Sequence, residues 1–397
     1  MISVEEALQI LDSHTVHFGS EIVDLDEANG RILEEDVFAD RPFPPFHRVT
    51  MDGIAIRYAT YGQGRRAFAV EQIAAAGAPQ CRLMDQEACI EVMTGAILPE
   101  GVDTVIRYED IRMDESGATI FAEVRLGQNI HRCGEDHPRG ARLIPAGTLL
   151  SAAEIGVAAT VGRSRVKVAR LPRVLLVSTG NELVNIDQQP QPHQIRKSNV
   201  YRIAATLKAM GLKADLLHLQ DDYESILTHL GARLDKYDVM LLSGGVSKGK
   251  YDYLPEALDA LGVVKHFHRI AQRPGKPLWF GSRAGGPVVF AFPGNPISSF
   301  LCTHAYFIPW LQKSLGFPQK QQPHAVLSET IEFKPDLTYY LEVSLEYRSN
   351  GTLYAIPRQG HGSGDLANLM RADAFIKLPR GQEVYPAGGT YPVYPFR

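Results

Sequence analysis

The sequence contains little cysteine, and none of it is arranged as in a metal site. Cys81, Cys89, Cys133 and Cys302 form no Cys-x-x-Cys pair, and no Cys/His cluster has zinc-site spacing. We therefore expect reduced thiols in a cytoplasmic protein. The acidic start of the chain lacks the apolar stretch of a signal peptide. No run of 18 apolar residues predicts a membrane span, so no membrane partner is expected.

The motifs of several common enzyme sites are also missing. The sequence has no Gly-x-x-x-x-Gly-Lys-[Ser/Thr], no Gly-x-Gly-x-x-Gly after a strand, no Gly-x-Ser-x-Gly and no His-Glu-x-x-His. These absences argue against a P-loop or Rossmann nucleotide site. The 41 Lys and Arg residues nearly balance the 45 Asp and Glu residues, so no nucleic-acid partner is expected.

Changes in composition divide the 397 residues into four predicted domains, because the chain is too long for one ordinary core. Short β-rich segments begin after the helix-breaking stretch Arg41-Pro-Phe-Pro-Pro45. Strand–helix alternation follows, and then half-exposed strands that suit a small barrel or sandwich. The predicted domains are an N-terminal helix/strand domain (1–40 with 138–167), an inserted β-rich domain (41–137), an α/β domain (168–317) and a small C-terminal β domain (318–397).

Polar capping residues predict where helices begin. Ser3 and Ser151 are each followed three residues later by glutamate, which is the pattern of a capping box. A short helical stretch is also expected within 26–36, ending near Leu33. In the α/β region, further helices are expected to begin at Ser198, Asp222 and Asn295-Pro296.

The alternation in 168–317 predicts a doubly wound, mostly parallel sheet. One strand, Val239 to Leu242, is apolar and ends in the loop Ser243-Gly-Gly-Val-Ser247. Two adjacent glycines let a ligand approach the main chain closely. Right-handed crossovers bring the carboxyl ends of parallel strands to one edge of the sheet, where open α/β sheets bind ligands.

Acids, bases and a helix start gather at this predicted edge. The free N–H groups at Asn295-Pro296 suit a phosphate, and Ser298 adds a hydroxyl. Taken singly, these residues also fit ordinary turns, a solvated basic face or helix caps. Together they predict a phosphorylated ligand that contains a ring with N–H donors. The basic members are Arg269, Arg273 and Lys276, and the acidic members, which suit such a ring or Mg²⁺, are Glu182, Asp221 and Asp252.

The combined motifs resemble the molybdopterin molybdenumtransferases, namely the MoeA proteins and the matching part of gephyrin. The resemblance to the molybdopterin-binding domain is carried by Ser178-Thr-Gly-Asn-Glu-Leu183, Ser243-Gly-Gly-Val-Ser247 with Asp252, Arg273-Pro-Gly-Lys-Pro277 and Pro293-Gly-Asn-Pro-Ile-Ser298. The inserted domain of the family is similar at Met51-Asp-Gly53, Met93-Thr-Gly95 and Arg132-Cys-Gly-Glu-Asp136.

The resemblance implies insertion of molybdate into adenylylated molybdopterin, with release of AMP and assistance from Mg²⁺. It also implies a homodimer whose active site lies between the third domain of one subunit and the second domain of the other. A molybdopterin adenylyltransferase is the implied upstream partner.

The resemblance also implies the site residues. The implied catalytic residues are Asp52, Thr94, Asp136, Glu182 and Asp252, of which Asp252 and Glu182 are the candidates for Mg²⁺. The implied substrate- and anion-binding residues are Asp221, Ser243, Gly244, Gly245, Ser247, Arg269, Arg273, Lys276, Pro293, Gly294, Asn295, Pro296 and Ser298.

Three segments depart from the usual family pattern. His47-Arg-Val-Thr-Met-Asp-Gly53 stands where Asn-Ser-Ala-Met-Asp-Gly is common, Arg269 and Arg273 replace lysines, and Lys197-Ser-Asn199 replaces Asp-Thr-Asn. Arginine keeps the charge but changes the geometry. The alternatives are a molybdopterin adenylyltransferase, which resembles the third domain only, a tungstate-inserting homologue and a non-catalytic, gephyrin-like scaffold.

Overall fold

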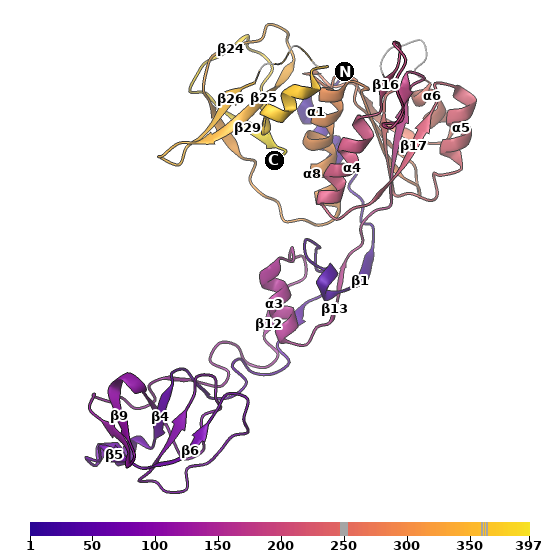
Figure 1. Cartoon of the computed structure of the whole chain (residues 1–397). Helices are drawn as coiled ribbons and strands as arrows, with labels where there is room; N and C mark the ends of the chain where they lie inside the picture. The colour runs from indigo at the N-terminus through magenta and orange to yellow at the C-terminus, as the bar shows by residue number, and fades with distance from the viewer. Residues whose placement is uncertain (247–252, 359, 361, 363) are drawn as a thin grey trace.

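The chain is elongated, with two large masses joined by a small connecting unit (Figure 1). The α/β unit and the C-terminal β unit lie together at one end, and the inserted β domain lies at the other. This computed structural model describes residues 1–246, 253–358, 360, 362 and 364–397. Two predicted site residues, Ser247 and Asp252, therefore lie outside the described residues.

A six-stranded sheet forms the centre of the α/β unit and confirms the predicted doubly wound, mostly parallel fold. Four neighbouring strands are parallel, whereas β21 runs antiparallel to both of its neighbours. The order is β17 (Ala214–Leu219), β14 (Val174–Thr179), β18 (Val239–Ser243), β22 (Val288–Phe292), β21 (Trp279–Ser282) and β19 (Val264–His268).

Helices cover both faces of this sheet, which explains the unbroken apolar runs of its central strands. Leu176 packs with α4 (Asn199–Ala209) and α7 (Pro296–Cys302) in one core, and Leu175 packs with α5 (Tyr223–Gly231) and α6 (Leu254–Ala260) in the other. Successive strand side chains point to opposite faces, so each central strand must be apolar throughout.

Most of the predicted helix starts are confirmed by capping hydrogen bonds. Ser3 and Ser151 form capping boxes, and Asp222 and Asn295 accept from backbone N–H groups three residues on. Ser198 precedes α4 but makes no capping bond, because its backbone is already near-helical at ψ −37°. The last long helix continues from α7 through a π-helical segment, η3 (Thr303–Phe307), into α8 (Ile308–Ser314).

The helical stretch expected within 26–36 is wrong. Only a 3₁₀ turn, η1 (Leu25–Glu27), forms there. Gly30 then takes a left-handed backbone at φ +78°, and Ile32 and Leu33 make β-bridges to Leu149 and Val168. Pairing with distant chain segments therefore overrides the local helical preference.

The connecting unit is built from chain that leaves for the inserted domain and chain that returns from it. β1 (Ser20–Asp24) pairs antiparallel with β13 (Arg165–Ala169), and β2 (Val37–Phe38) pairs with β12 (Arg142–Ile144). Helix α3 (Ala152–Thr160) packs against them. Helix α1 (Val4–Ser13), by contrast, contributes Val4, Ala7 and Leu11 to the core of the α/β unit.

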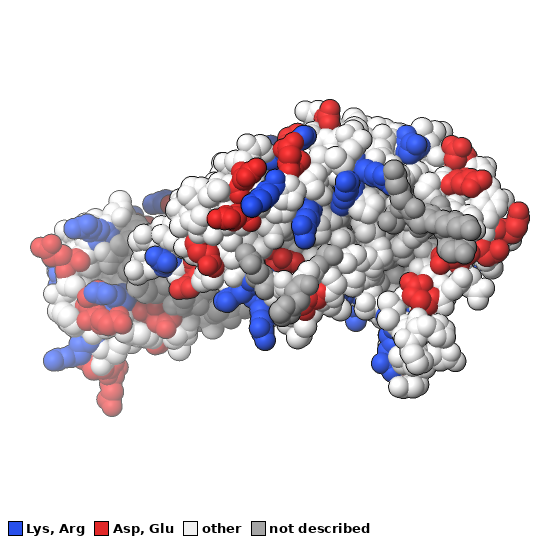
Figure 2. Space-filling view, turned by 90° about the horizontal axis from the view of Figure 1, so that it is seen from above, with Lys and Arg blue, Asp and Glu red and all other residues white. Residues whose placement is uncertain are grey.

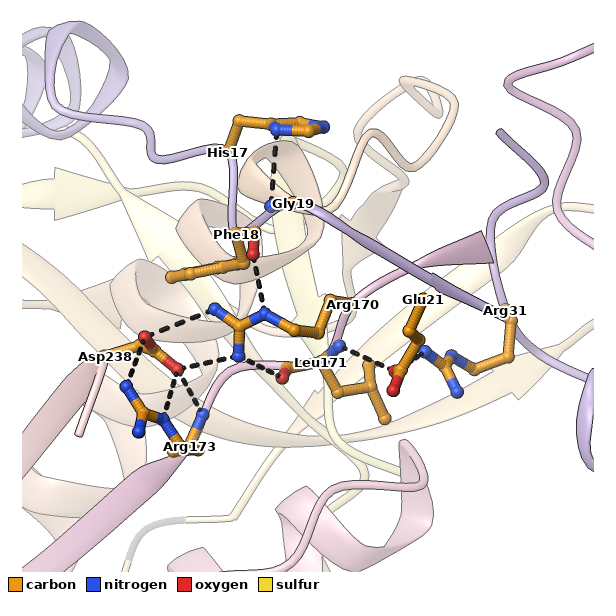
Figure 3. A network of polar contacts seen from close by, with 9 residues as sticks. All are labelled: His17, Phe18, Gly19, Glu21, Arg31, Arg170, Leu171, Arg173 and Asp238. Atoms are coloured by element: carbon orange, nitrogen blue, oxygen red, sulfur yellow. Dashed lines mark hydrogen bonds and ion pairs between the residues drawn. The ribbon is translucent and has the colours of Figure 1, made fainter. Parts of the chain in front are cut away.

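A polar joint ties the connecting strands to the base of the α/β sheet (Figure 3). Asp238, just before β18, accepts hydrogen bonds from the guanidinium of Arg170 at 3.0 and 3.2 Å and from the backbone N–H of Arg173 at 2.7 Å. Arg170 also donates to the Phe18 carbonyl at 2.7 Å. Burial alone would raise the pKa of Asp238, but the hydrogen bonds and charge of the two arginines outweigh it and lower the pKa to about 2.

The inserted domain is β-rich, as predicted. Its elements are β3 (Arg48–Val49), β4 (Gly53–Ile56), α2 (Tyr58–Gly62), β5 (Ala67–Phe68), β6 (Val70–Ala74), β7 (Cys89–Val92), β8 (Thr104–Arg107), η2 (Tyr108–Asp110), β9 (Ile111–Asp114), β10 (Gly117–Ile120) and β11 (Ile130–His131). They form a four-stranded sheet β6-β7-β4-β8, a three-stranded sheet β5-β10-β9 and the ribbon β11-β3.

The C-terminal unit is a small barrel, because β25 pairs with both β26 and β27 and closes the sheet. Its elements are β23 (His324–Leu327), β24 (Ile331–Glu332), β25 (Thr338–Tyr347), β26 (Leu353–Pro357), η4 (Leu366–Arg371), β27 (Ala374–Leu378), β28 (Val384–Tyr385) and β29 (Thr390–Pro395). No helix within the described residues combines the length and apolarity needed to cross a bilayer.

Candidate active site

A cleft of about 670 Å³ opens at the carboxyl edge of the α/β sheet, where the sequence predicted a ligand site. It is lined by the loops that follow β14, β17, β18 and β22 and by the loop before β21. The predicted residues that line it are Glu182, Asp221, Ser243, Gly244, Gly245, Arg273, Lys276, Pro293, Gly294, Asn295, Pro296 and Ser298.

Adjacent glycines form the floor of the cleft. Gly244 has φ +104°, and a Cβ there would lie 2.8 Å from the Thr179 carbonyl oxygen. A Cβ on Gly245, at φ +68°, would lie 2.7 Å from the Leu254 side chain. Both positions therefore require glycine, for backbone conformation and for space.

The basic loop 269–278 reaches the cleft because β21 is antiparallel. The end of β19 and the start of β21 consequently meet at the same edge as the ends of the parallel strands. Within this loop β20 (Gln272–Arg273) pairs with β25 of the C-terminal barrel, which fixes the backbone beside Lys276. Arg269 lies at the base of the loop with a left-handed backbone at φ +76°, and it is not among the residues that line the cleft.

Two residues on α4 that the sequence analysis did not assign hold the turn Pro293–Pro296. The Asn199 amide donates to the Gly294 carbonyl at 2.8 Å and to the Ser243 hydroxyl at 2.9 Å. Arg202 donates to the Pro296 carbonyl at 3.0 Å, and burial lowers its pKa to about 10. The sequence signal that could have identified Asn199 and Arg202 is a pair of polar residues at i and i+3 on the first turn of a helix that packs on a doubly wound sheet.

Two carboxylates, Glu182 and Asp221, line the cleft after β14 and β17, and the basic residues Arg196 and Lys197 line it as well. Asp221 and Asn181 tie the ends of two neighbouring strands, because each backbone N–H donates to the other side chain, at 3.1 and 3.4 Å. A Cβ on Gly180 would lie 2.5 Å from a Glu182 oxygen, so that glycine makes room for the carboxylate. The described residues contain no group of three metal-ligating side chains. Mg²⁺ commonly takes one or two carboxylates and completes its shell with water and phosphate oxygens, and Glu182 and Asp221 fit such a site.

The remaining predicted residues gather in the inserted domain, at the other end of the chain from the cleft (Figure 1). Asp52 accepts from the Thr94 N–H at 2.5 Å, and hydrogen bonds from Thr94 hold the pKa of Asp52 below its usual value. Asp136 lies 3.0 Å from a His131 ring nitrogen. One copy of the chain therefore builds two separate clusters.

Positive charge at the cleft comes from a few placed residues. Over the face seen from above, Lys and Arg side chains alternate with Asp and Glu side chains (Figure 2). The basic residues that line the cleft are Arg196, Lys197, Arg273 and Lys276, and the helix that begins at Pro296 adds its N-terminus as a further site for an oxyanion.

This architecture defines a molybdopterin-binding α/β protein. A family model described as "Probable molybdopterin binding domain" matches residues 175–313. Models of the MoeA N-terminal region (domain I and II) and the MoeA C-terminal region (domain IV) match residues 2–162 and 324–396. The chain thus belongs to the MoeA family of molybdopterin molybdenumtransferases, as its motifs suggested.

Relatives and solved structures match over almost the whole chain. A molybdopterin molybdenumtransferase of Synechocystis is 39% identical over 99% of this chain and 100% of its own length. One from Nostoc is 33% identical over 93% of this chain and 87% of its own. The crystal structure of a molybdopterin biosynthesis MoeA protein from Pyrococcus horikosii superposes with a TM-score of 0.84 at 28% identity, covering 100% of this chain and 99% of that one.

These matches confirm the predicted family, fold and enzyme class. The protein is a molybdopterin molybdenumtransferase of molybdenum cofactor biosynthesis. Its substrates are accordingly molybdate and a molybdopterin. The full-length coverage argues against the alternative of an adenylyltransferase that resembles the third domain alone.

Proposed function

We propose that this enzyme takes adenylylated molybdopterin, releases AMP with the help of Mg²⁺, and leaves molybdenum on the dithiolene of the pterin. The observation that carries the proposal is the composition of the cleft at the sheet edge. Arg273 and Lys276 line it with a helix N-terminus, Glu182 and Asp221 line it at the ends of other strands with Arg196 and Lys197 nearby, and the floor is glycine. Phosphoryl chemistry depends mainly on placed charge, which this cleft supplies without a covalent nucleophile.

In this proposal the basic and acidic residues of the cleft have different roles. The basic residues hold oxyanions, either the phosphates of the adenylylated pterin or molybdate, which are both tetrahedral and charged. The acidic residues accept hydrogen bonds from ring N–H groups, and Glu182 with Asp221 would hold Mg²⁺. When bound, Mg²⁺ supplies charge neutralisation at the phosphoanhydride.

The active site is proposed to form between two copies of the chain. Support for this comes from the position of Asp52, Thr94 and Asp136, which lie in the inserted domain, far from the cleft of the same chain (Figure 1). In a homodimer, the inserted domain of one subunit would present the carboxylates of Asp52 and Asp136, with Thr94 beside Asp52, to the cleft of its partner. They would orient water at the phosphoanhydride. A molybdopterin adenylyltransferase is the proposed upstream partner, and a cytoplasmic location remains a prediction.

The decisive experiment is incubation of the purified protein with adenylylated molybdopterin, Mg²⁺ and molybdate. AMP release and transfer of molybdenum to the pterin are expected. Intact adenylylated pterin at the end of the reaction would contradict the proposal. ATP-dependent adenylylation of apo-pterin would favour the adenylyltransferase alternative, and the absence of both reactions would favour a scaffold. A parallel incubation with tungstate tests the tungstate-inserting alternative.

A further inference from the structure

A row of three polar side chains crosses the ribbon β3–β11 of the inserted domain. Arg48 and His131 are direct cross-strand partners in this ribbon. An Arg48 Nη2 nitrogen lies 3.3 Å from His131 Nδ1, and His131 Nε2 lies 3.0 Å from Asp136 Oδ1. Arg48 belongs to the segment that departs from the usual family motif, and nothing in the proposed function so far explains it.

The chemistry of arginine decides which nitrogen of His131 carries the proton. A guanidinium only donates hydrogen bonds, so Nδ1 of His131 must accept from Arg48. The proton of the neutral imidazole then sits on Nε2 and is donated to Asp136.

Other contacts fix the backbone around Asp136 and leave its side chain to His131. The Asp136 N–H donates to the Phe43 carbonyl at 3.0 Å, and the Cys133 N–H donates to a His47 ring nitrogen at 3.1 Å. The Asp136 side chain is 52% exposed, whereas that of His131 is 24% exposed. The carboxylate is therefore accessible to a substrate, while the ring that holds it is largely enclosed.

We propose that Arg48 and His131 are positioning residues for Asp136: Arg48 selects the Nε2–H form of His131, and that form holds one Asp136 oxygen so that the other faces the substrate. The inference rests on the proposed function, in which Asp136 acts on substrate in the partner's cleft. It extends that function, because it makes the departure at Arg48 part of the active site.

Kinetics test the inference through a split between kcat and KM. His131→Phe is expected to lower kcat for AMP release about tenfold, the effect usual for a lost orienting partner. KM for adenylylated molybdopterin should not change, because other residues line the cleft. In an Asp136→Asn background, His131→Phe should cause no further loss. Arg48→Lys, which still only donates, should keep most of the activity, whereas Arg48→Glu should lower kcat as much as His131→Phe does.

A spectroscopic measurement tests the same inference without activity. Ring ¹⁵N shifts of histidine-labelled protein, with the His131 signals identified by their loss in His131→Phe, should report the Nε2–H form. In Arg48→Glu the new carboxylate accepts a hydrogen bond from Nδ1–H, which should switch the ring to the Nδ1–H form. Arg112→Glu, an equal charge change on β9 of the same domain, is the control and should leave both the ring form and kcat unchanged.

The outcomes separate this inference from the function on which it rests. If Asp136→Asn is inactive while His131→Phe keeps the kcat of the wild type, the positioning role is overturned and the proposed function stands. An Nδ1–H ring in the wild type also overturns it. If the wild type releases no AMP, the proposed function fails, and the ring shifts still decide whether Arg48 sets the form of His131. Thermal unfolding of each variant identifies a loss of kcat that comes from a loss of fold.

Discussion

The cleft and the acidic cluster of the inserted domain are built in different ways. Strand ends of a sheet covered on both faces form the cleft, and its floor is packed so tightly that two glycines are required. The acidic cluster stands on surface loops of a smaller β domain, where Asp52 and Asp136 are exposed; Thr94 holds Asp52 by hydrogen bonds, and His131 holds Asp136. A rigid cleft suits ligand binding, whereas exposed carboxylates on a separate domain suit delivery into another subunit. Predictions that affect one region and spare the other test this division.

The largest effect is expected when each region loses one carboxylate. Glu182→Gln and Asp136→Asn should each lower AMP release by about a thousandfold or more, because charge placed at the reacting group is lost. Mixed subunits should recover activity, because a dimer of the two variants has one site with both carboxylates intact. Random mixing should restore about a quarter of the wild-type rate if each site takes one half from each subunit.

The control for this experiment is Glu182→Gln mixed with itself, which should stay inactive. If the two variants mixed together also stay inactive, although they form dimers, both carboxylates come from one subunit and the division between the two regions is wrong.

Lowering the pH should also distinguish the two regions, because it should destabilise the α/β unit before the inserted domain. His304 packs between Phe300 and Phe396, and burial lowers its pKa to about 4 from an ordinary 6.5. The folded state thus keeps His304 neutral while the unfolded state takes up a proton below pH 6.5. Stability should fall by about 3 kcal/mol as the pH drops from 6.5 to about 4, and the loss ends below the folded pKa.

Hydrogen exchange in the segment 296–314 at neutral pH and at about pH 5 measures this effect. His304→Phe keeps the aromatic packing and should remove most of the pH dependence. Equal acid sensitivity of the variant and the wild type would mean that another group is responsible.

Breaking the polar joint at Asp238, which links the two regions, should lower the free energy of unfolding by about 2 kcal/mol. The pKa of Asp238 is lowered from 3.8 to about 2, so it contributes stability that is present above pH 3.8 and lost as the pH falls toward 2. Asp238→Asn should destabilise the protein by about that amount at neutral pH and should increase hydrogen exchange in β1 and β13.

Asp235→Asn is the matched control for the joint. Asp235 pairs with Arg283 but is 81% exposed, so its loss should cost less than about 1 kcal/mol. Equal effects of the two substitutions would show that the joint is an ordinary surface ion pair.

The smallest effect is expected from the charge of the basic loop. Arg273→Ala should raise KM for the oxyanion that Arg273 holds by about tenfold, which is about 1.4 kcal/mol, and Arg273→Lys should recover part of it. Measuring KM for molybdate and for adenylylated molybdopterin separately identifies that oxyanion. Arg48→Lys in the inserted domain should change neither KM. A fall in kcat without a change in KM for Arg273→Ala would mean that Arg273 acts in the reaction step. The cleft would then not be limited to ligand binding, and the contrast with the inserted domain would weaken.

Much of the fold was predictable because its signals are local. The capping residues Ser3, Asp222 and Asn295 mark helix starts through hydrogen bonds within one turn. The buried strand of Val239 to Leu242 is evident as an apolar run. The helix expected within 26–36 failed because distant β-bridges decide the conformation of Leu33. Asn199 and Arg202 were not assigned, because what they hold is a turn almost a hundred residues away.

The components of the site could be identified along the chain, because residue type and position at a strand end depend on sequence neighbours. Ser243, Gly244 and Gly245 follow an apolar strand, and that order alone predicts a glycine floor at a sheet edge. Which of these components lie together depends on the three-dimensional fold. The antiparallel course of β21 brings Lys276 to the cleft, and the connecting unit holds the inserted domain, with Asp136, away from it. Strand direction and domain spacing depend on packing between distant segments, which local sequence does not specify.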